Sequence, residues 1–131
     1  MDIDNLNETE ETAYEFGRII RMSEFPASMK KSVAFNARND AESLSKAGID
    51  VLTLAGIITI AGVKAVTKEP CTNVYLVTDE GKAYFTQSDG IAASVNDMLD
   101  MFDNDVNGVV IRIVTRDTGN GRTRKYIRIM D

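Results

Sequence analysis

Histidine is absent from this chain of 131 residues, and cysteine occurs once, as Cys71. These absences exclude a Ser-His or Cys-His nucleophile pair, a zinc site built from histidine and cysteine, and an internal disulfide bond. A lone cysteine without an obvious activating neighbour is typical of a reducing compartment and an unreactive thiol. Any catalytic acid or base would have to be an aspartate or glutamate, and no paired arrangement of these is evident. We therefore expect a protein that is not an enzyme, with no catalytic residues, no bound metal and no cofactor.

Long hydrophobic runs are also lacking. Residues 51–63 carry no charge, but they are rich in β-branched side chains and shorter than the ~20 apolar residues that cross a bilayer. The first residues, MDIDNLNETEE, are acidic, whereas a signal peptide begins with basic residues. We therefore expect a cytoplasmic protein that does not contact a membrane.

The net charge of −5 is distributed unevenly along the chain. Residues 1–11 contain five acidic residues and no basic one, and five more aspartates fall within residues 89–105. From Arg112 onward, six basic residues stand against two acidic ones. A pI of 4.8 alone argues against nucleic acid as a partner. Binding depends on the electrostatic field of one face of a protein and not on its net charge. Because the charges here are segregated, nucleic acid is still a candidate partner.

The chain is predicted to have an N-terminal extension, residues 1–27, and one domain, residues 28–131. The extension is acidic and is expected to be partly disordered or helical, with a mobile tail over residues 1–11. A short helix over residues 12–25 is expected to end before Pro26, because the residue preceding a proline resists helical dihedral angles.

The start of the domain is predicted to contain a strand and a short helix. Residues 32–37 (SVAFNA) alternate in the manner of a strand that places Val33 and Phe35 on one face. Asn39 is expected to cap a helix over residues 40–47.

Five strands and one helix are predicted in the remainder of the domain. A long β-rich run over residues 52–66 contains Gly56 and Gly62, which are expected to bend or bulge the strand. A helix beginning at Ser88 or Asp89 has one apolar stripe, formed by Ile91, Val95, Met98, Leu99 and Phe102. The other strands are predicted in two hairpins, over residues 73–78 and 82–86 and over residues 109–116 and 123–129.

This order of elements is that of an OB-fold. A long bent strand, two strands, a helix and two further strands build a five-stranded Greek-key barrel, with the helix between the third and fourth strands. The alternative is another α+β sheet with one covering helix, because element order alone does not distinguish the two. We expect a mostly β, OB-like barrel of the α+β class, with residues 32–37 as an additional edge strand.

The last hairpin carries the most informative pattern. If Arg116 lies opposite Arg122, strand alternation gathers one set of side chains on one face: Val110, Arg112, Val114, Arg116, Arg124, Tyr126 and Arg128. The opposite face would then hold apolar core residues, namely Val109, Ile111, Ile113, Ile127 and Ile129.

A tyrosine among guanidinium groups is typical of a surface for single-stranded nucleic acid. The cations follow the phosphates while the ring stacks under a base, at ~1–3 kcal/mol per base. The alternative is a solvated strand face whose arginine stems cover apolar neighbours. Tyr75, Tyr84 and Lys82 on the preceding hairpin favour binding, because the second and third strands of an OB barrel form its binding surface.

A second group of basic residues surrounds Phe35. Phe35 is expected either to stack on a base or, as a strand phenylalanine does more often, to lie in the core. The complete candidate set for nucleic-acid binding comprises Lys30, Lys31, Phe35, Arg38, Lys64, Tyr75, Lys82, Tyr84, Arg112, Arg116, Arg122, Arg124, Tyr126 and Arg128.

Several short motifs follow one another between residues 33 and 129. They are Phe35-Asn36-Ala37, Ser43-Leu44, Gly48, the hairpin NVYLVTDEGKAYFTQSDG and the helix IAASVNDMLDMF. This pattern resembles the small single-stranded DNA-binding proteins of phages that replicate linear genomes by protein priming. In that family a D-G-x-x-Y hairpin leads to a helix that starts at serine and then to a basic hairpin; here Glu80 is one extra residue after Asp79. The acidic residues 1–11 and the segment 12–25 are not part of the pattern.

The resemblance implies sequence-independent coating of displaced single strands during phage DNA replication, in the host cytoplasm, with Tyr84 and the Phe35 cluster as contacts. The acidic N-terminal segment is then expected to recruit replication proteins or to compete with DNA for the basic face. A second copy of the chain is a further candidate partner.

The alternative function is a small acidic phage protein that inhibits a host nucleic-acid enzyme by protein contact, its acids mimicking phosphates. Affinity for DNA that falls with salt would favour the first.

Overall fold

The longest strand, β3 (Val51–Val63), is the element around which the sheet is built. In the computed structural model, which describes residues 17–130, residues 54–60 of this strand are all buried. Uncharged aliphatic and β-branched side chains suit a strand that is covered on both faces. The register shifts between Leu54 and Gly56, which confirms the bulge expected at that glycine. At Gly62 the pairing is regular, and the side chain of Asn73 fills the space that a Cβ would need.

Three strands pair with β3. Its first residues pair with β6 (Val110–Gly119), and residues 54–63 pair with β4 (Pro70–Thr78). On the edge opposite β4, residues 58–60 pair with β1 (Ile19–Met22).

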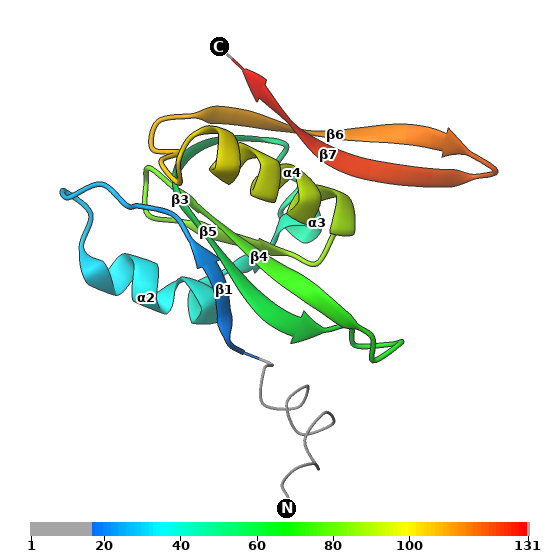
Figure 1. The fold of residues 1–131 in the computed structure, drawn as a ribbon, viewed down its shortest axis with the longest axis horizontal. Coiled ribbons are helices and arrows are strands. Elements are labelled where there is room, and N and C mark those ends of the chain that lie inside the picture. The colour runs from blue at the N-terminus through cyan, green and yellow to red at the C-terminus, as the bar shows by residue number, and fades with distance from the viewer. Residues whose placement is uncertain (1–16, 131) are drawn as a thin grey trace, which may run out of the picture.

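Three further strands extend this sheet outward. They are β5 (Ala83–Thr86) beside β4, β2 (Glu42–Ser43) beside β5, and β7 (Arg122–Met130) beside β6. The result is a curled, half-barrel sheet that stays open, because β5 and β7 do not pair anywhere in residues 17–130 (Figure 1).

Helices cover two parts of the curled sheet and define two apolar clusters. The larger cluster lies against α4 (Asp89–Met101) and includes Ile91, Val95, Leu99, Leu54, Ile57, Leu76 and Ile111. The smaller cluster lies against α2 (Lys31–Asp40) and includes Ala37, Ile58, Ile60, Tyr75 and Val77. The short helix α3 (Leu44–Ala47) ends at Gly48, whose φ of 68° is left-handed. No helix within residues 17–130 is long and apolar enough to cross a membrane.

The structure confirms the two hairpins and the helix predicted for the C-terminal two thirds of the chain, but no register shift occurs at Gly62, where a bend or bulge was also expected. Both hairpins form, and α4 begins where the Ser88 hydroxyl accepts the N–H of Ile91 at 3.2 Å. The buried residues of α4 include four of the five predicted stripe residues, and Phe102 is half-buried at its end.

Three predictions for the N-terminal third were wrong. Residues 32–37 lie in α2 rather than in a strand, because Val33 and Ala37, four residues apart, share the packed face while Phe35 points outward. Part of the helix expected over residues 12–25 is instead β1, because β3 offers a free edge to pair with.

Pairing with β5 likewise draws residues 42 and 43 into β2, so the helical part of residues 40–47 shrinks to α3 and its cap moves from Asn39 to Ser43. The mobile tail expected over residues 1–11 lies outside the described residues, as do residues 12–16 of the expected helix.

Candidate nucleic-acid interface

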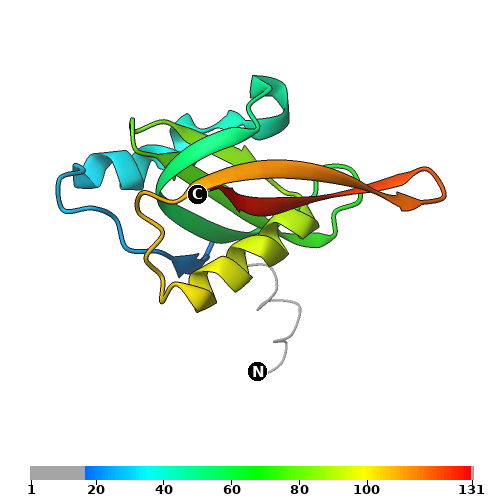
Figure 2. The ribbon, with the colours of Figure 1, turned by 90° about the horizontal axis from the view of Figure 1, so that it is seen from above.

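The arm, residues 110–130, is the β6–β7 hairpin and extends past the end of α4 (Figures 1 and 2). Ile111 anchors its base in the core, while residues 115–124 are exposed. The turn Gly119-Asn120-Gly121 has positive φ at all three residues, a conformation that glycine and asparagine adopt most easily. The arm therefore presents a two-stranded ribbon to solvent.

Cross-strand pairing places the arginines of the arm on one face. The pairs on this face are Arg112–Arg128, Val114–Tyr126 and Arg116–Arg124. Arg116 was expected opposite Arg122, but a bulge between Asp117 and Gly119 moves the pairing by two residues, which leaves the same side chains on the same face. We call this surface the arginine face; it consists of Arg112, Arg116, Arg122, Arg124, Tyr126 and Arg128.

Like charges oppose each other across the arginine face. Two of its cross-strand pairs are arginine opposite arginine, an arrangement that destabilises a sheet. Within residues 17–130, none of its five arginines forms an ion pair. Asp117 is the one acid of the arm, and its carboxylate accepts the N–H of Gly119 at 2.9 Å. No ion pair formed within the described residues therefore neutralises this face.

An aromatic ring lies in the middle of the arginine face. Tyr126 is half-buried, and the guanidinium carbon of Arg116 lies 5.3 Å from its ring centroid. This is the geometry of a cation–π contact, which holds the guanidinium plane near the ring. Both planar groups are of the kind on which unpaired bases stack.

Helix α4 and strand β3 hold the arm in place at its two edges. The N–H of Ile127 donates to the hydroxyl of Ser94 at 3.1 Å, and the N–H of Ile113 donates to the carbonyl of Asp50 at 2.7 Å. A side chain at Gly90 would run into the carbonyl oxygen of Lys125, so glycine permits the close approach of α4 to β7. These contacts give the arginine face a fixed orientation relative to the core.

Sequence reasoning missed two residues of β3 that extend this surface. Val51 lies beside Arg112 and Thr53 beside Val110, and Val51 is 42% exposed. The barrel order of strands was the available signal, because it places the first strand next to the fourth.

Tyr75 and Tyr84 are core residues, which corrects their expected position on the binding surface. Their exposed fractions are 8% and 5%, and the Tyr75 ring packs 5.4 Å from that of Phe85. Burial raises the pKa of Tyr75, and the charge of Arg38 opposes that shift. Because neither ring offers a free face, the stacking role expected for these two tyrosines is not supported.

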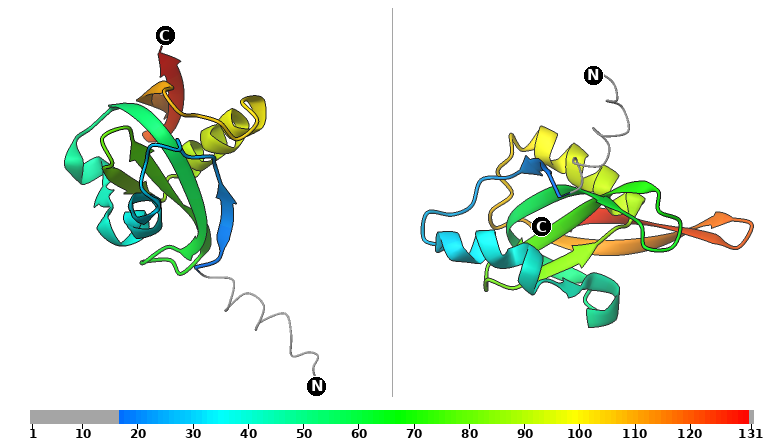
Figure 3. Two further views of the ribbon diagram at one scale, coloured as in Figure 1. Left: turned by 90° about the vertical axis from the view of Figure 1, so that its left-hand side faces the viewer. Right: turned by 90° about the horizontal axis from the view of Figure 1, so that it is seen from below.

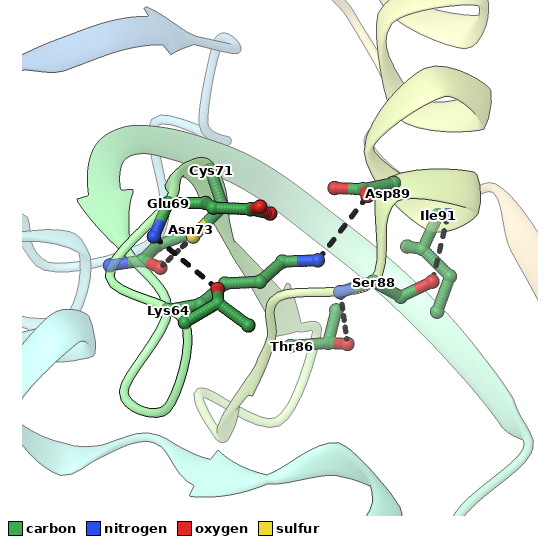
Figure 4. Close-up of polar contacts among 9 residues, drawn as sticks. Lys64, Glu69, Cys71, Asn73, Thr86, Ser88, Asp89 and Ile91 are labelled. Atoms are coloured by element: carbon green, nitrogen blue, oxygen red, sulfur yellow. Dashed lines mark hydrogen bonds and ion pairs between the residues drawn. The ribbon is translucent and has the colours of Figure 1, made fainter.

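Lys64 is held by an ion pair rather than left free on the surface. Its Nζ lies 3.3 Å from the Oδ2 of Asp89, in the first turn of α4 (Figure 4). Burial raises the pKa of the nearby Cys71 thiol; Lys64 lowers that pKa and Asp89 raises it further. This region is neutralised locally and adds little to the field of the arginine face.

The second predicted cluster does assemble, but on a different part of the molecule. Lys30, Lys31, Phe35 and Arg38 all line one groove beside α2, and Phe35 is 71% exposed. Helix α2 and the arm lie at opposite ends of the molecule (Figures 1 and 3). Lys82, in the β4–β5 turn, lines a separate pocket against α2. The structure therefore divides the predicted residues between two main surfaces instead of gathering them on one.

No family model matches the chain, and neither does any curated protein or solved structure. In the part of the chain that the structure describes, no group of three or more His, Cys, Asp or Glu residues is placed to hold a metal ion.

Proposed function

We propose that this protein binds single-stranded DNA along the arginine face and catalyses no reaction. The observation that carries the proposal is the unmatched positive charge of that face, with arginine opposite arginine in two cross-strand pairs. Such repulsion costs stability in the free protein, and a polyanion lying along the face removes it. A chain of net charge −5 that concentrates six basic residues against one acid in its arm has separated its charges spatially.

The side chains of the arginine face are proposed to bind two different parts of the DNA. The guanidinium groups neutralise phosphates, and the ring of Tyr126 and the guanidinium plane of Arg116 accept unpaired bases by stacking. Because stacking uses the face that every base has, binding is independent of sequence. In the replication of a phage genome, such a protein coats displaced strands in the host cytoplasm.

We further propose that the sheet is an OB-like barrel left open on one side. The support is its connectivity: the long first strand of the barrel pairs with both the second and the fourth, and α4 follows the third. The binding surface differs from that of the usual barrel, because it lies on the last hairpin rather than on the second and third strands.

The direct test is fluorescence anisotropy of a labelled oligothymidine titrated with the full chain at low and at physiological salt. We expect binding that weakens with salt, because bound arginines release counterions from the phosphates. Duplex DNA is the decisive control, because a two-stranded ribbon also fits the major groove of a duplex. No binding at low salt would overturn the proposal and leave the alternative of an acidic protein that binds a host enzyme.

A matched pair of variants localises the site. Arg124→Ala removes one charge from the arginine face, and Lys46→Ala removes one charge from the exposed surface of α3. The first is expected to lower affinity and to reduce the slope of log affinity against log salt by about 0.7, the contribution of one phosphate contact on a single strand. The second is expected to leave both unchanged. Equal effects of the two would show that binding follows net charge and not this face.

A further inference from the structure

A groove with an apolar floor and a basic rim runs between β1 and α2, on the opposite side of the molecule from the arm. It encloses about 620 Å³. Its large apolar lining residues are Ile19, Met22, Phe25, Met29, Phe35, Ile58 and Ile60, and the smaller Pro26, Ala27 and Ala34 complete the apolar lining. Ile19 and Met22 are about half exposed, at 49% and 47%, so the groove holds apolar surface that the described residues leave uncovered. An open apolar groove of this kind indicates a binding site for another segment.

The rim of the groove favours an anionic occupant. Lys30 and Lys31 stand at the N-terminus of α2 and Arg38 in its last turn, and no acid occupies the first turn. Two cations at the positive end of a helix dipole are unfavourable, so an anion placed there from elsewhere in the chain would stabilise the helix. Within residues 17–130, none of the three forms an ion pair.

The lining favours a peptide over a nucleic acid. Five of the seven large apolar residues that line the groove are aliphatic or thioether side chains, which pack well against the side chains of a peptide. Bases instead prefer aromatic platforms, and the one exposed ring here is Phe35. The chemistry thus points to an acidic peptide that also carries bulky apolar side chains.

Residues 1–16 of this chain have that composition. They contain six carboxylates and no lysine or arginine, together with Ile3, Leu6, Tyr14 and Phe16. The described chain begins at Gly17, which lines a small hollow with Arg38 and Ile60 at one end of the groove. The segment therefore joins the described chain next to one end of the groove, and 16 extended residues reach about 50 Å.

We propose that residues 1–16 fold back into this groove, with Tyr14 and Phe16 on its apolar floor and the acidic side chains against its basic rim. The spacing of the charges agrees with this arrangement. From Arg38 to Lys30 along α2 is about 12 Å, which an extended chain covers in about four residues. Glu15 and Glu11 have that separation, so one meets Arg38 while the other meets the two lysines. This docking does not depend on nucleic-acid binding at the arm.

The test follows the methyl signals of ¹³C-labelled methionines in the full chain. A nitroxide is attached to Asn7→Cys in a Cys71→Ser background, and signal intensities are compared before and after reduction of the nitroxide. Met29 lines the groove at the end distant from Gly17, whereas Met98 lies in the α4 core and Met130 at the end of the arm. We expect Met29 to lose at least half of its intensity, with Met98 and Met130 affected less.

Reversing the charge of the rim distinguishes docking in the groove from the proximity that the covalent connection of residues 1–16 to the chain gives by itself. In Lys30→Glu with Lys31→Glu, we expect the Met29 signal to recover, whereas the matched pair Lys46→Glu with Lys68→Glu leaves it broadened. The reversal does not endanger α2, because acids suit the first turn of a helix. A Met29 signal that is equally intense in all three proteins would overturn the proposal.

Two mixing experiments identify other occupants. Broadening of Met29 in a ¹³C-labelled chain mixed with an unlabelled, spin-labelled chain would assign the groove to the segment of a second copy and overturn docking within one chain. A shift of the Met29 methyl signal when oligothymidine is added to the Arg124→Ala variant would assign the groove to nucleic acid and likewise overturn it. The proposal expects neither effect.

Discussion

The guanidinium carbon of Arg116 lies 5.3 Å from the ring centroid of Tyr126, across the two strands of the arm. The two residues are diagonal neighbours, since Arg116 pairs with Arg124 and Tyr126 pairs with Val114. This contact holds one of the arginines in a defined orientation in the middle of a face that otherwise consists of mutually repelling cations.

Replacing the ring should weaken DNA binding without regard to sequence. Tyr126→Leu is expected to lower affinity for oligothymidine by about 5- to 150-fold, the equivalent of ~1–3 kcal/mol of lost stacking. Arg116→Lys, which keeps the charge but loses the planar group, should have a smaller effect in the same direction. Anisotropy titrations with oligothymidine and with a mixed sequence measure both. A loss confined to one sequence would contradict stacking as the mechanism.

Removing one of the opposed arginines should stabilise the protein while weakening binding. Arg128→Thr relieves the repulsion with Arg112 and is expected to raise the free energy of unfolding by about 0.2–1 kcal/mol at low salt. The gain should shrink at high salt, where the repulsion is screened. Urea unfolding at two salt concentrations measures this, with Arg128→Lys as the charge-conserving control. A loss of stability in low salt would show that Arg128 has a favourable partner.

Substitutions of the buried Tyr84 and of the half-buried Tyr126 should have opposite effects. Tyr84→Ala is expected to lower the free energy of unfolding by about 3–5 kcal/mol, because it empties a core position, while Tyr84→Phe should leave DNA binding unchanged. Tyr126→Ala should cost less stability and reduce binding. Thermal unfolding and anisotropy on the same samples separate the two effects. If the Tyr84→Phe variant folds normally but binds DNA more weakly, Tyr84 contacts DNA and the prediction is wrong.

The contact of α4 with the arm should depend on the absence of a side chain at Gly90. Gly90→Ala places a methyl group against the backbone carbonyl of Lys125, which cannot rotate away, and is expected to destabilise the protein by about 1–3 kcal/mol. Asp97→Ala on the exposed side of the same helix should change stability by less than about 0.5 kcal/mol. Chemical unfolding of the two variants provides the comparison. Equal free energies of unfolding for the two variants would mean that α4 and β7 accommodate the added methyl group at Gly90 without loss of stability.

The thiol of Cys71 should respond to its charged neighbours. Burial raises its pKa and Lys64 opposes that shift, so Lys64→Met is expected to raise the pKa further by removing a positive charge that favours the thiolate. The rate of alkylation by iodoacetamide, measured against pH, should fall at neutral pH in this variant. Lys46→Met is the control. A profile that moves to lower pH would contradict the placement of Lys64 beside the thiol.

Local sequence was sufficient for the elements whose partners are adjacent in the chain. The two hairpins and the stripe of α4 were predictable because a two-residue or 3.6-residue repeat reports directly which side chains share a face. The arginine face survived a register error of two residues for the same reason: a shift by an even number leaves every side chain on its side of the ribbon.

Tertiary contacts decided the N-terminal third. Val33 and Phe35 alternate as in a strand, yet residues 31–40 form a helix because Val33 and Ala37 pack on the smaller cluster. In the same way, β1 exists because residues 58–60 of β3 offer it an edge, which no pattern within residues 17–25 reveals.

For the candidate site, the sequence by itself determined that the arm carries its arginines on one face around a tyrosine, since strand alternation is a local property. The tertiary structure alone decided which aromatic rings remain accessible and which basic residues are neighbours. It buries Tyr75 and Tyr84 and pairs Lys64 with Asp89. It also places the cluster on α2 at the far end of the molecule from the arm (Figure 3). Burial and the grouping of distant segments depend on how the elements pack around β3, and that packing is a property of the whole chain.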